Sequence, residues 1–465
     1  MSAAPVSGVG ELCDAPRIEV TRGGASGADD LLGVRRLRAL GEKSLWSLVD
    51  QGLTALTGFC VTFLLARWLS AEIYGAYAIA FAGYLFVGGL HNVIVLEPMS
   101  VMGPSRHAHG LREYFRAQIA VHGILAGACS AVVVCAGLVG RLIAPDSGLA
   151  GAIAGSGLAL SLLLLLFLAR RMCYVLQRPL TAVLGSGTCL ALTIPGLYAL
   201  RWLHQVSPFS VFLLIGAASL AGSCVVLREI GALRKSRVAA EPIAWDLALR
   251  ENWSYGRWLV GSSILYSVAG SVQMFVAAAI LGLGAAGILR AMMLPASVMT
   301  QAVTAAGLLV LPGLSYDFGR GRVDLIRRKA VIVSGSLGAA GLCFAAVLWG
   351  FAGRAEHLLF GGKYAAYAWL MPMLALIPAA NGLTMGFSAA LRASQKPHYD
   401  LWANAIAAPI AIVSAIGFIR WWGVAGAAAS LVTGFVVYMA VNCWCFCSAA
   451  ESGVKREIWS DGEVA

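Results

Sequence analysis

Charged residues are scarce in this sequence of 465 residues. Asp, Glu, Lys and Arg make up 12% of it and hydrophobic residues 59%, whereas soluble domains contain about 25% charged residues. So few charged side chains do not cover the surface of a soluble protein of this length. The composition therefore predicts an integral membrane protein, and the mean hydropathy of +0.79 agrees with that prediction.

Patterns that indicate catalysis or metal binding are also lacking. The sequence has no nucleophile elbow, no phosphate-binding glycine loop and no pair of acids in a sizeable extramembrane loop. Nearly all of its eleven Cys lie in hydrophobic runs, and the closely spaced Cys443, Cys445 and Cys447 have no His nearby. We expect these cysteines to be packing residues rather than metal ligands or a disulfide framework. We also expect no enzymatic activity and no cofactor.

Long hydrophobic segments, by contrast, are abundant. A helix needs about 20 apolar residues to cross a bilayer, and twelve segments meet this requirement. They lie at 45–66, 73–101, 114–140, 149–169, 180–200, 209–227, 258–280, 285–312, 330–351, 366–390, 401–419 and 423–447. The predicted fold class is an all-α membrane protein with twelve transmembrane helices, six in each of two bundles.

The predicted spans divide the chain into five parts. These are a disordered cytoplasmic tail (1–41), a six-helix bundle (42–227), a basic cytoplasmic linker (228–257), a second six-helix bundle (258–450) and a cytoplasmic C-terminal tail (451–465). In the linker, residues on one helical face suggest an amphipathic helix in the membrane interface, which acts as a hinge or as a regulatory element. The residues of that face are Trp245, Ala248, Leu249 and Trp253.

Lys and Arg are distributed unequally between the two sides of the membrane. If the N-terminus is cytoplasmic, most of the 34 lie in cytoplasmic segments, as the positive-inside rule requires. We therefore expect both termini in the cytoplasm. Attraction to anionic lipids of the cytoplasmic leaflet explains the net charge of +11, and no nucleic-acid partner is needed.

The two halves of the sequence resemble each other. Gly75 aligns with Gly287, and further along LQRP (176–179) aligns with SQKP (394–397). Each half has an even number of spans, so both enter the membrane in the same direction and are related by an axis along the membrane normal. Two such bundles enclose a central cavity, and rocking of one against the other gives alternating access. The repeat therefore predicts a transporter.

Several ionisable residues lie inside predicted spans, where a charge costs about 2.5–3.5 kcal/mol on insertion scales. Arg290, in span eight, either snorkels to the interface or lines the cavity and binds an anion through its forked guanidinium. Glu97 either ends a helix at the interface, binds a coupling cation or pairs with an arginine. Asp50 is most simply a first-turn acid at a helix N-terminus. Polar residues expected to form hydrogen bonds between helices are His91, Asn92, Gln118 and His122.

Two segments resemble a known family of transporters. FLLARWLSAEIYGAYAIAFAGYLF (63–86) is similar to the junction of spans one and two in polysaccharide-unit (Wzx-type) flippases, members of the multidrug/oligosaccharidyl-lipid/polysaccharide (MOP) exporter superfamily. The residues that carry this similarity are Ala66, Arg67, Glu72, Gly75 and Tyr77. GILRAMMLP (287–295) is similar to the start of span eight, where an Arg five residues before Pro also occurs in the lipid II flippase branch. The resemblance covers 42–450.

The resemblance implies alternating-access transport of an undecaprenyl-diphosphate-linked oligosaccharide across the bacterial inner membrane, for exopolysaccharide or O-antigen-type synthesis. The other partners it implies are anionic lipids at the cytoplasmic face and the polysaccharide polymerase or export machinery. Relatives carry an acid where this chain has Gln273, so coupling to a proton or sodium gradient stays open. The substrate-binding candidates are Arg290, Arg67, Asn92, Gln273 and His122, and the coupling-ion candidates are Glu97 and Asp50.

Four other functions fit the sequence less well. A multidrug exporter of the same fold favours acids that hold organic cations, and this chain offers only Asp50 and Glu97 inside its predicted spans. A lipid II flippase tends to have more than twelve spans. A membrane polymerase or ligase acting on the same carrier needs a large periplasmic loop, and the longest here is 352–365. A twelve-span facilitator is disfavoured because GPSRHAHGLRE (103–113) lacks a Gly-x-x-x-Asp-Arg pattern.

Overall fold

The computed structural model describes residues 27–145, 147–231, 243–320, 322–394 and 398–460. The chain divides into two compact units, Met1–Leu45 and Trp46–Ala465, and the contacts that build the candidate site lie within the second. Across the described ranges the chain is helical and has no strand. The predicted all-α class is confirmed.

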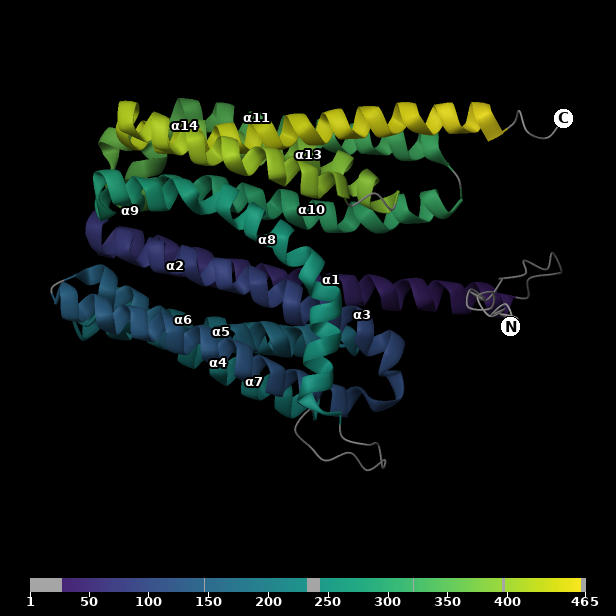
Figure 1. Cartoon of the computed structure of the whole chain (residues 1–465), viewed down its shortest axis with the longest axis horizontal. Helices are drawn as coiled ribbons and strands as arrows, with labels where there is room; N and C mark the ends of the chain where they lie inside the picture. Colours follow the sequence, from purple (N-terminus) through teal and green to yellow (C-terminus); the bar gives the residue numbers. More distant parts are fainter. Residues whose placement is uncertain (1–26, 146, 232–242, 321, 395–397, 461–465) are drawn as a thin grey trace, which may run out of the picture. The chain divides into compact units, whose positions relative to one another are not determined.

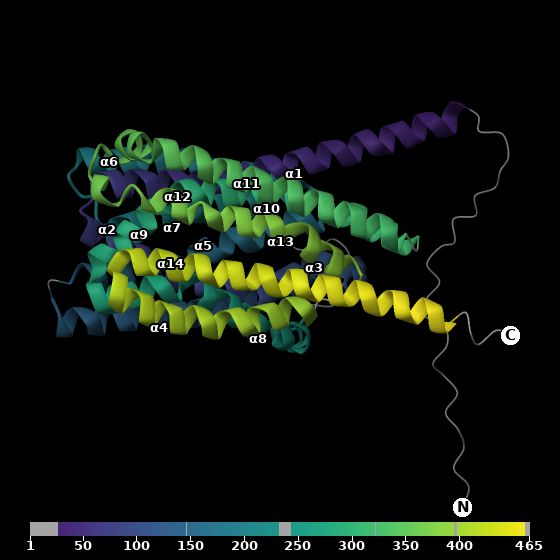
Figure 2. The ribbon, with the colours of Figure 1, turned by 90° about the horizontal axis from the view of Figure 1, so that it is seen from above.

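Helices follow one another along the whole described chain. They are α1 (Gly27–Trp68), α2 (Ala71–His91), the π-helix η1 (Asn92–Leu96), α3 (Glu97–Arg106), η2 (Ala108–Gly110), α4 (Leu111–Ile143), α5 (Gly148–Val175), α6 (Pro179–Trp202), α7 (Pro208–Glu229), α8 (Trp245–Leu281), α9 (Leu283–Met292), α10 (Leu294–Gly319), α11 (Val323–Phe360), η3 (Ala365–Tyr367), α12 (Leu370–Leu374), α13 (Leu376–Ala393) and α14 (His398–Ser460). α14 is two helices, because the backbone at Gly423 leaves the helical region (φ 59°, ψ −133°). Figures 1 and 2 show its two halves side by side.

The described residues contain the twelve spans that the sequence predicts. Ten helices are long and apolar enough to cross a bilayer, and one of these, α14, crosses twice. α9 and α10 form one further span, bent by 50°. The bend follows from Pro295 in the first turn of α10, which has no N–H to donate to the preceding turn. The continuous helix predicted at 285–312 is therefore wrong at this point.

The two predicted tails are more helical than expected where they are described. Residues 27–41 form the first turns of α1, and α14 continues through the start of the C-terminal tail to Ser460. No proline interrupts either segment, so a helix that has formed in the membrane propagates outward at little cost. The rest of the N-terminal tail, residues 232–242 of the linker and residues 461–465 lie outside the described residues.

Successive spans connect at alternate ends of the helix bundle. We call the end with the turns at 69–70, 282 and 361–369 the distal end, and the end with the turns at 107–110 and 176–178 the proximal end. The predicted orientation places the proximal end in the cytoplasm. Some turns are fixed by local chemistry: the Ser70 hydroxyl accepts the Ile73 N–H at 3.3 Å and so caps α2.

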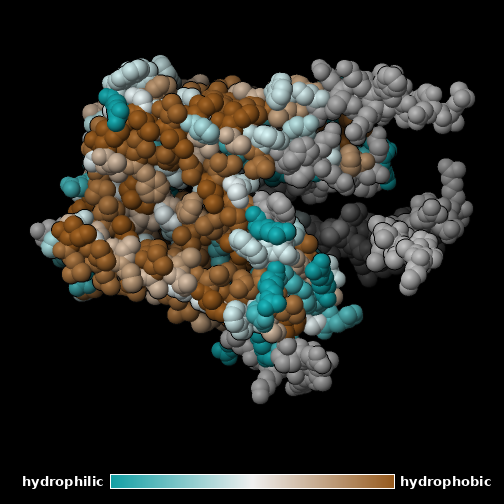
Figure 3. Space-filling model, in the orientation of Figure 1, coloured by the Kyte–Doolittle hydropathy of each residue, from teal (hydrophilic) through white to brown (hydrophobic). Residues whose placement is uncertain are grey.

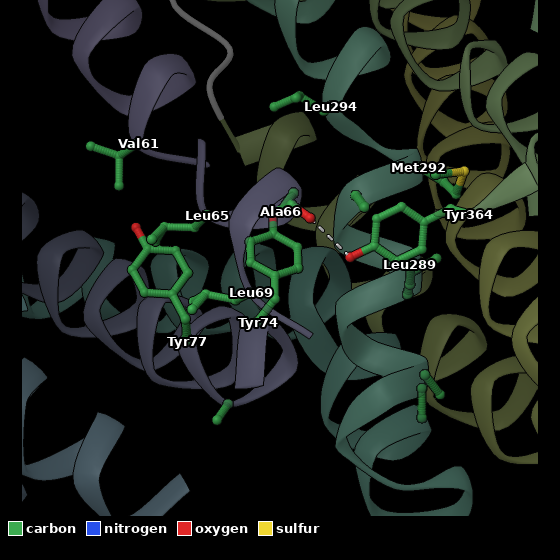
Figure 4. Packing of buried hydrophobic residues seen from close by; sticks show 14 of the residues in the cluster. Val61, Leu65, Ala66, Leu69, Tyr74, Tyr77, Leu289, Met292, Leu294 and Tyr364 are labelled. Atoms are coloured by element: carbon green, nitrogen blue, oxygen red, sulfur yellow. Dashed lines mark hydrogen bonds between the residues drawn. The ribbon is translucent and has the colours of Figure 1, made fainter. Parts of the chain in front are cut away.

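Figure 1 shows α2–α7 packed as one group and α9–α14 as another, with α8 crossing between them. We call the first group, together with residues 46–68 of α1, the N-half, and the second group the C-half. At the distal end, buried side chains of both halves form one cluster, in which Leu65 and Tyr74 pack with Leu289 and Tyr364 (Figure 4). At the proximal end, one cluster joins α3, α4 and α5 with α8, and another is confined to the C-half. The hydrophobic core that joins the halves is therefore distal.

α8 differs from its predicted form. The predicted interfacial helix is not separate from span seven, because nothing in the sequence breaks Trp245–Leu281 into two helices. Its first turns pack on the N-half through Ala248 and Asn252, which are fully buried, whereas Trp253 of the predicted apolar face is exposed. The face of α8 that packs on the N-half carries small side chains, because these allow the helices to approach closely. Figure 3 shows hydrophilic side chains gathered around these first turns, beside a largely hydrophobic surface.

α2 and α9 cross at two glycines. A Cβ atom on Gly75 would lie 1.8 Å from the backbone oxygen of Leu283, and one on Gly287 would lie 2.1 Å from that of Ala71. Only glycine fits at either position. Gly75 and Gly287 are also the residues that the sequence repeat aligns. Two residues related by a two-fold axis can touch each other only beside that axis, so the contact of Gly75 with Gly287 is the one that the predicted axis would produce.

Replacing Gly75 by Ala should force α2 and α9 apart and lower the free energy of unfolding by about 1–3 kcal/mol, as overpacking does elsewhere. Gly83→Ala, on the same helix, is the matched control because its added Cβ has no atom within 4 Å. Thermal unfolding of the purified variants in detergent measures the difference. Equal midpoints for Gly75→Ala and Gly83→Ala would show that the crossing is not a close contact.

Candidate functional site

A cavity of about 860 Å³ lies beside the α2–α9 crossing. The N-half lines it with α1, α2, α5, α6 and α7, and the C-half contributes the bend between α9 and α10, from Arg290 to Gln301. Pockets that hold ligands have volumes of about 300–1,000 Å³ and mostly apolar walls with a few polar groups. This cavity fits that description, and both halves build it.

Arg290 belongs to the lining of this cavity. Its guanidinium lies 5.1 Å from the centre of the Phe81 ring, which continues an aromatic row along α2 to Tyr77 and Tyr84. A cation over an aromatic face is attracted by the ring quadrupole, so the row holds the arginine in the cavity. Within the described part of the chain, no carboxylate forms an ion pair with Arg290.

Asp50 and Arg170 form a buried ion pair on the wall of the cavity. The Arg170 Nε donates to both carboxylate oxygens of Asp50 at 3.1 Å, and Nη2 donates to Oδ2 at 2.7 Å. The Ser186 hydroxyl donates to Oδ1 at 2.5 Å, and the Tyr174 hydroxyl donates to Oδ2. The carboxylate is 0% exposed, and these donors occupy its oxygens. Asp50 thus neutralises Arg170 and fixes its position.

The sequence interpretation of Asp50 as a first-turn acid is wrong. α1 begins at Gly27 rather than near residue 45, so Asp50 lies in the helix interior. An acid at that depth needs a counter-ion, and Arg170 supplies it from α5.

A second cavity, of about 370 Å³, adjoins the first. The two share Gln51, Tyr84 and Phe167 among their lining residues. The second cavity adds Asn92 and Arg171, whose Nη2 donates to Asn92 Oδ1 at 3.2 Å. Its wall also includes His91.

The two linings carry positive charge. Their charged residues are Arg170, Arg171 and Arg290, and no carboxylate of the described chain lines either cavity. Asp50 lies behind Arg170 and compensates that one cation. Of the remaining arginines, Arg171 interacts with the half-buried Glu97, whereas Arg290 has no ion-pair partner among the described residues. The two linings therefore keep a net positive charge. The site is therefore suited to an anion and repels a cation.

The other predicted site residues lie in different surroundings. Arg67 is exposed at the distal end of α1 and does not line either cavity. Gln273 is buried in α8, where its amide donates to the Ala269 oxygen at 3.2 Å. Glu97 is half-buried and interacts electrostatically with Arg171 and, in the C-half, Arg392. His122 is buried behind His91, as described below.

The sequence interpretation missed Arg170 and Arg171, because both follow the predicted span 149–169 and therefore count among the residues of a cytoplasmic segment. Both lie inside α5, which runs to Val175. The positive-inside rule explains arginines near the end of a span equally well. It therefore gave no reason to expect that these two line a cavity. The available signal was Asp50: an acid inside a span requires a cation on a neighbouring helix.

The distal end is closed by a contact that we call the distal latch. Lys363, in the loop after α11, donates hydrogen bonds to the backbone oxygens of Ala66, at 2.8 Å, and Leu69. The Tyr364 hydroxyl donates to the same Ala66 oxygen at 3.2 Å (Figure 4). The last carbonyls of a helix lack partners within the helix and carry partial negative charge, so the lysine stabilises the end of α1. Partial burial lowers the pKa of Lys363.

Comparisons with known proteins reveal the fold but no close relative. No protein-family model and no curated protein matches the chain. A multidrug resistance MATE family transporter of the MOP superfamily, in an inward-facing conformation, is 13% identical over 88% of this chain and 99% of its own, with a TM-score of 0.70. The lipid II flippase MurJ, inward closed, is 13% identical over 87% of both chains (TM-score 0.65). A eukaryotic MATE transporter is 15% identical over 90% of this chain and 99% of its own (TM-score 0.63).

These identities establish the fold alone. The chain is a multi-pass membrane protein with the fold that MATE transporters and MurJ share.

Asp50→Asn should destabilise the protein strongly, because it leaves the Arg170 guanidinium buried without a counter-ion, a loss of about 3–5 kcal/mol. The double variant Asp50→Asn/Arg170→Gln removes both charges and should recover most of that stability. Thermal unfolding of the three proteins in detergent checks this. If the single variant is as stable as the unmodified protein, the pair is not the interaction described here.

Lys363→Met should weaken the distal latch and expose the cavity more often to the distal side. Ser297→Cys, which lines the cavity, serves as a reporter for a membrane-impermeant maleimide added outside intact cells. Lys363→Met should increase its labelling severalfold over the parent, measured against the same proteins without the reporter. Lys363→Arg keeps the charge and should leave labelling low. Unchanged labelling in Lys363→Met would mean that the latch does not hold this end closed.

Proposed function

We propose that this protein is a flippase that moves an undecaprenyl-diphosphate-linked oligosaccharide from the cytoplasmic to the periplasmic leaflet of the bacterial inner membrane. The observation that carries the proposal is the charge of the cavity lining, which contains three arginines and no described carboxylate. Such a lining suits the diphosphate of a lipid-linked sugar. The family resemblance of 63–86 and of 287–295 supports the same substrate class.

Arg290 is the proposed diphosphate ligand. A guanidinium presents forked donors that match phosphate oxygens, and this one faces the cavity without a carboxylate partner among the described residues. The Arg290 guanidinium lies against the Phe81 ring and interacts with the Tyr74 hydroxyl, and neither of these groups neutralises its charge. Arg171, whose Nη2 donates to Asn92 and which also interacts with Glu97, is a second donor. Arg67, outside the lining, is not needed in this arrangement.

The arrangement of the halves supports transport by alternating access. The core between them and the latch of Lys363 lie at the distal end, whereas the proximal clusters do not join the C-half to α3, α4 or α5. With the orientation that Lys and Arg predict, the structure is an inward-facing state. The substrate headgroup enters from the cytoplasm, and opening of the distal contacts releases it on the opposite side for the polymerase or export machinery.

Two alternatives share this fold. An exporter of organic cations needs acids in its cavity, and the described lining has none. A lipid II flippase would use the same cationic site for its lipid diphosphate, and the MurJ structure shares this fold. Binding of a lipid diphosphate therefore distinguishes either flippase function from drug export.

Undecaprenyl diphosphate should bind the purified protein, and Arg290→Ala should weaken this binding about tenfold or more, because a charge-assisted hydrogen bond contributes roughly 1.5–3 kcal/mol. Arg67→Ala is the matched control and should bind as the unmodified protein does. Binding is measured by microscale thermophoresis in nanodiscs. Binding of ethidium, an organic cation, in place of undecaprenyl diphosphate would overturn the flippase proposal in favour of drug export.

A further inference from the structure

Two buried histidines form a pair at the wall of the second cavity. His91 Nε2 lies 3.0 Å from His122 Nδ1, and the side chains are 6% and 3% exposed. His91 lines the cavity. Its second ring nitrogen, Nδ1, is buried and has no hydrogen-bond partner. A buried polar atom without a partner costs about 1–3 kcal/mol, and a ligand group that reached this nitrogen would recover that cost.

The hydrogen bond between the two histidines determines what kind of ligand group can bind His91 Nδ1. If His91 Nε2 donates to His122, the neutral ring leaves a lone pair on His91 Nδ1; if His122 donates, His91 Nδ1 carries the proton instead. A carboxylate satisfies only the second arrangement and a cation only the first. A hydroxyl both donates and accepts, so it satisfies either one. The free nitrogen is matched to a hydroxyl.

The rest of the cavity has the polar and aromatic groups that sugar rings need. Planar amide and guanidinium groups come from Gln51, Asn92 and Arg171, and aromatic faces come from Tyr84 and Phe167. Only one bond joins Asn92 to Arg171, which leaves further donors on both groups for hydroxyl oxygens. The volume of about 370 Å³ is at the lower end of the range for ligand pockets.

The backbone next to His91 is held in an unusual form. The π-helix η1 begins at Asn92, and single π-turns inside α-helices occur frequently at functional sites. α8 supports this turn closely, since a Cβ on Gly256 would lie 2.6 Å from the Val93 oxygen. One turn earlier, Asn252 and Gln118 exchange two hydrogen bonds of 2.9 and 3.1 Å. The position of Asn92 beside His91 is thus fixed by packing.

We infer that the second cavity is a sugar subsite, in which a hydroxyl of the sugar nearest the diphosphate binds His91 Nδ1 beside Asn92 and Arg171. The inference rests on the proposed function, because the cavity adjoins the one that holds Arg290. The diphosphate then occupies the first cavity and the sugar the second, with Gln51 and Tyr84 at their boundary. His122 is a positioning residue that orients His91.

Two defined lipids separate the sugar from the diphosphate: undecaprenyl diphosphate and undecaprenyl-diphosphate-linked N-acetylglucosamine. The unmodified protein should bind the second about fivefold more tightly, as one added hydrogen bond gives. His91→Phe should bind both lipids equally and keep its affinity for undecaprenyl diphosphate. His91→Gln, which can still donate and accept, should recover part of the preference. His109→Phe, an exposed histidine in the loop before α4, should keep all of it.

The outcomes distinguish the subsite from the function. If the unmodified protein binds undecaprenyl diphosphate but gains nothing from the sugar, the subsite is refuted and the flippase proposal stands. If it binds neither lipid, the proposed function fails and the subsite with it. Size-exclusion chromatography and thermal midpoints show whether His91→Phe folds. Should it not, the smaller His91→Leu takes its place, and a retained preference in that variant refutes the subsite.

Discussion

The close approach of α2 and α9 at Gly75 and Gly287 is the constraint on which the rest of the site depends. With no side chain at either position, the backbones come together and the C-half helix enters the wall of an N-half cavity. Arg290 lies one turn beyond Gly287 and is carried over Phe81 by that approach. A larger residue at the crossing would move the arginine away from the cavity. The packing of two glycines thus determines the electrostatics of the site.

The charge of the site follows from which ions are already paired. Arg170 is matched by Asp50 within the wall, whereas Arg290 has an aromatic partner instead. Burying a cation without a counter-ion is expensive, and a protein retains one where a ligand supplies the missing charge. The proposed substrate, a lipid diphosphate, would supply this charge while its hydrocarbon chain remained in the bilayer. The same lining disfavours organic cations, although the fold also serves multidrug transporters such as the similar MATE structure.

The sequence predicts those features that depend on local composition. The twelve spans follow from hydropathy, and the alignment of Gly75 with Gly287 becomes a contact in the structure. Features that depend on how a helix is rotated about its axis could not be predicted from the sequence. Whether Arg290 snorkels or faces the cavity is decided by the bend at Pro295, and the partner of Asp50 is a residue that charge counting placed in a loop. On α8, the predicted face includes Ala248, which is buried, and Trp253, which is exposed; which of these residues contacts the N-half depends on helix packing and not on composition.

The most direct test of a positively charged cavity that carries a diphosphate headgroup across the bilayer is transport by the purified protein. Proteoliposomes containing undecaprenyl-diphosphate-linked N-acetylglucosamine are treated with an impermeant galactosyltransferase, and the fraction of lipid that becomes accessible is followed over time. The protein should make nearly all of this lipid accessible but should not move a neutral glucosyl diacylglycerol labelled in the same way. Movement of both lipids at the same rate, or of neither, would contradict the account.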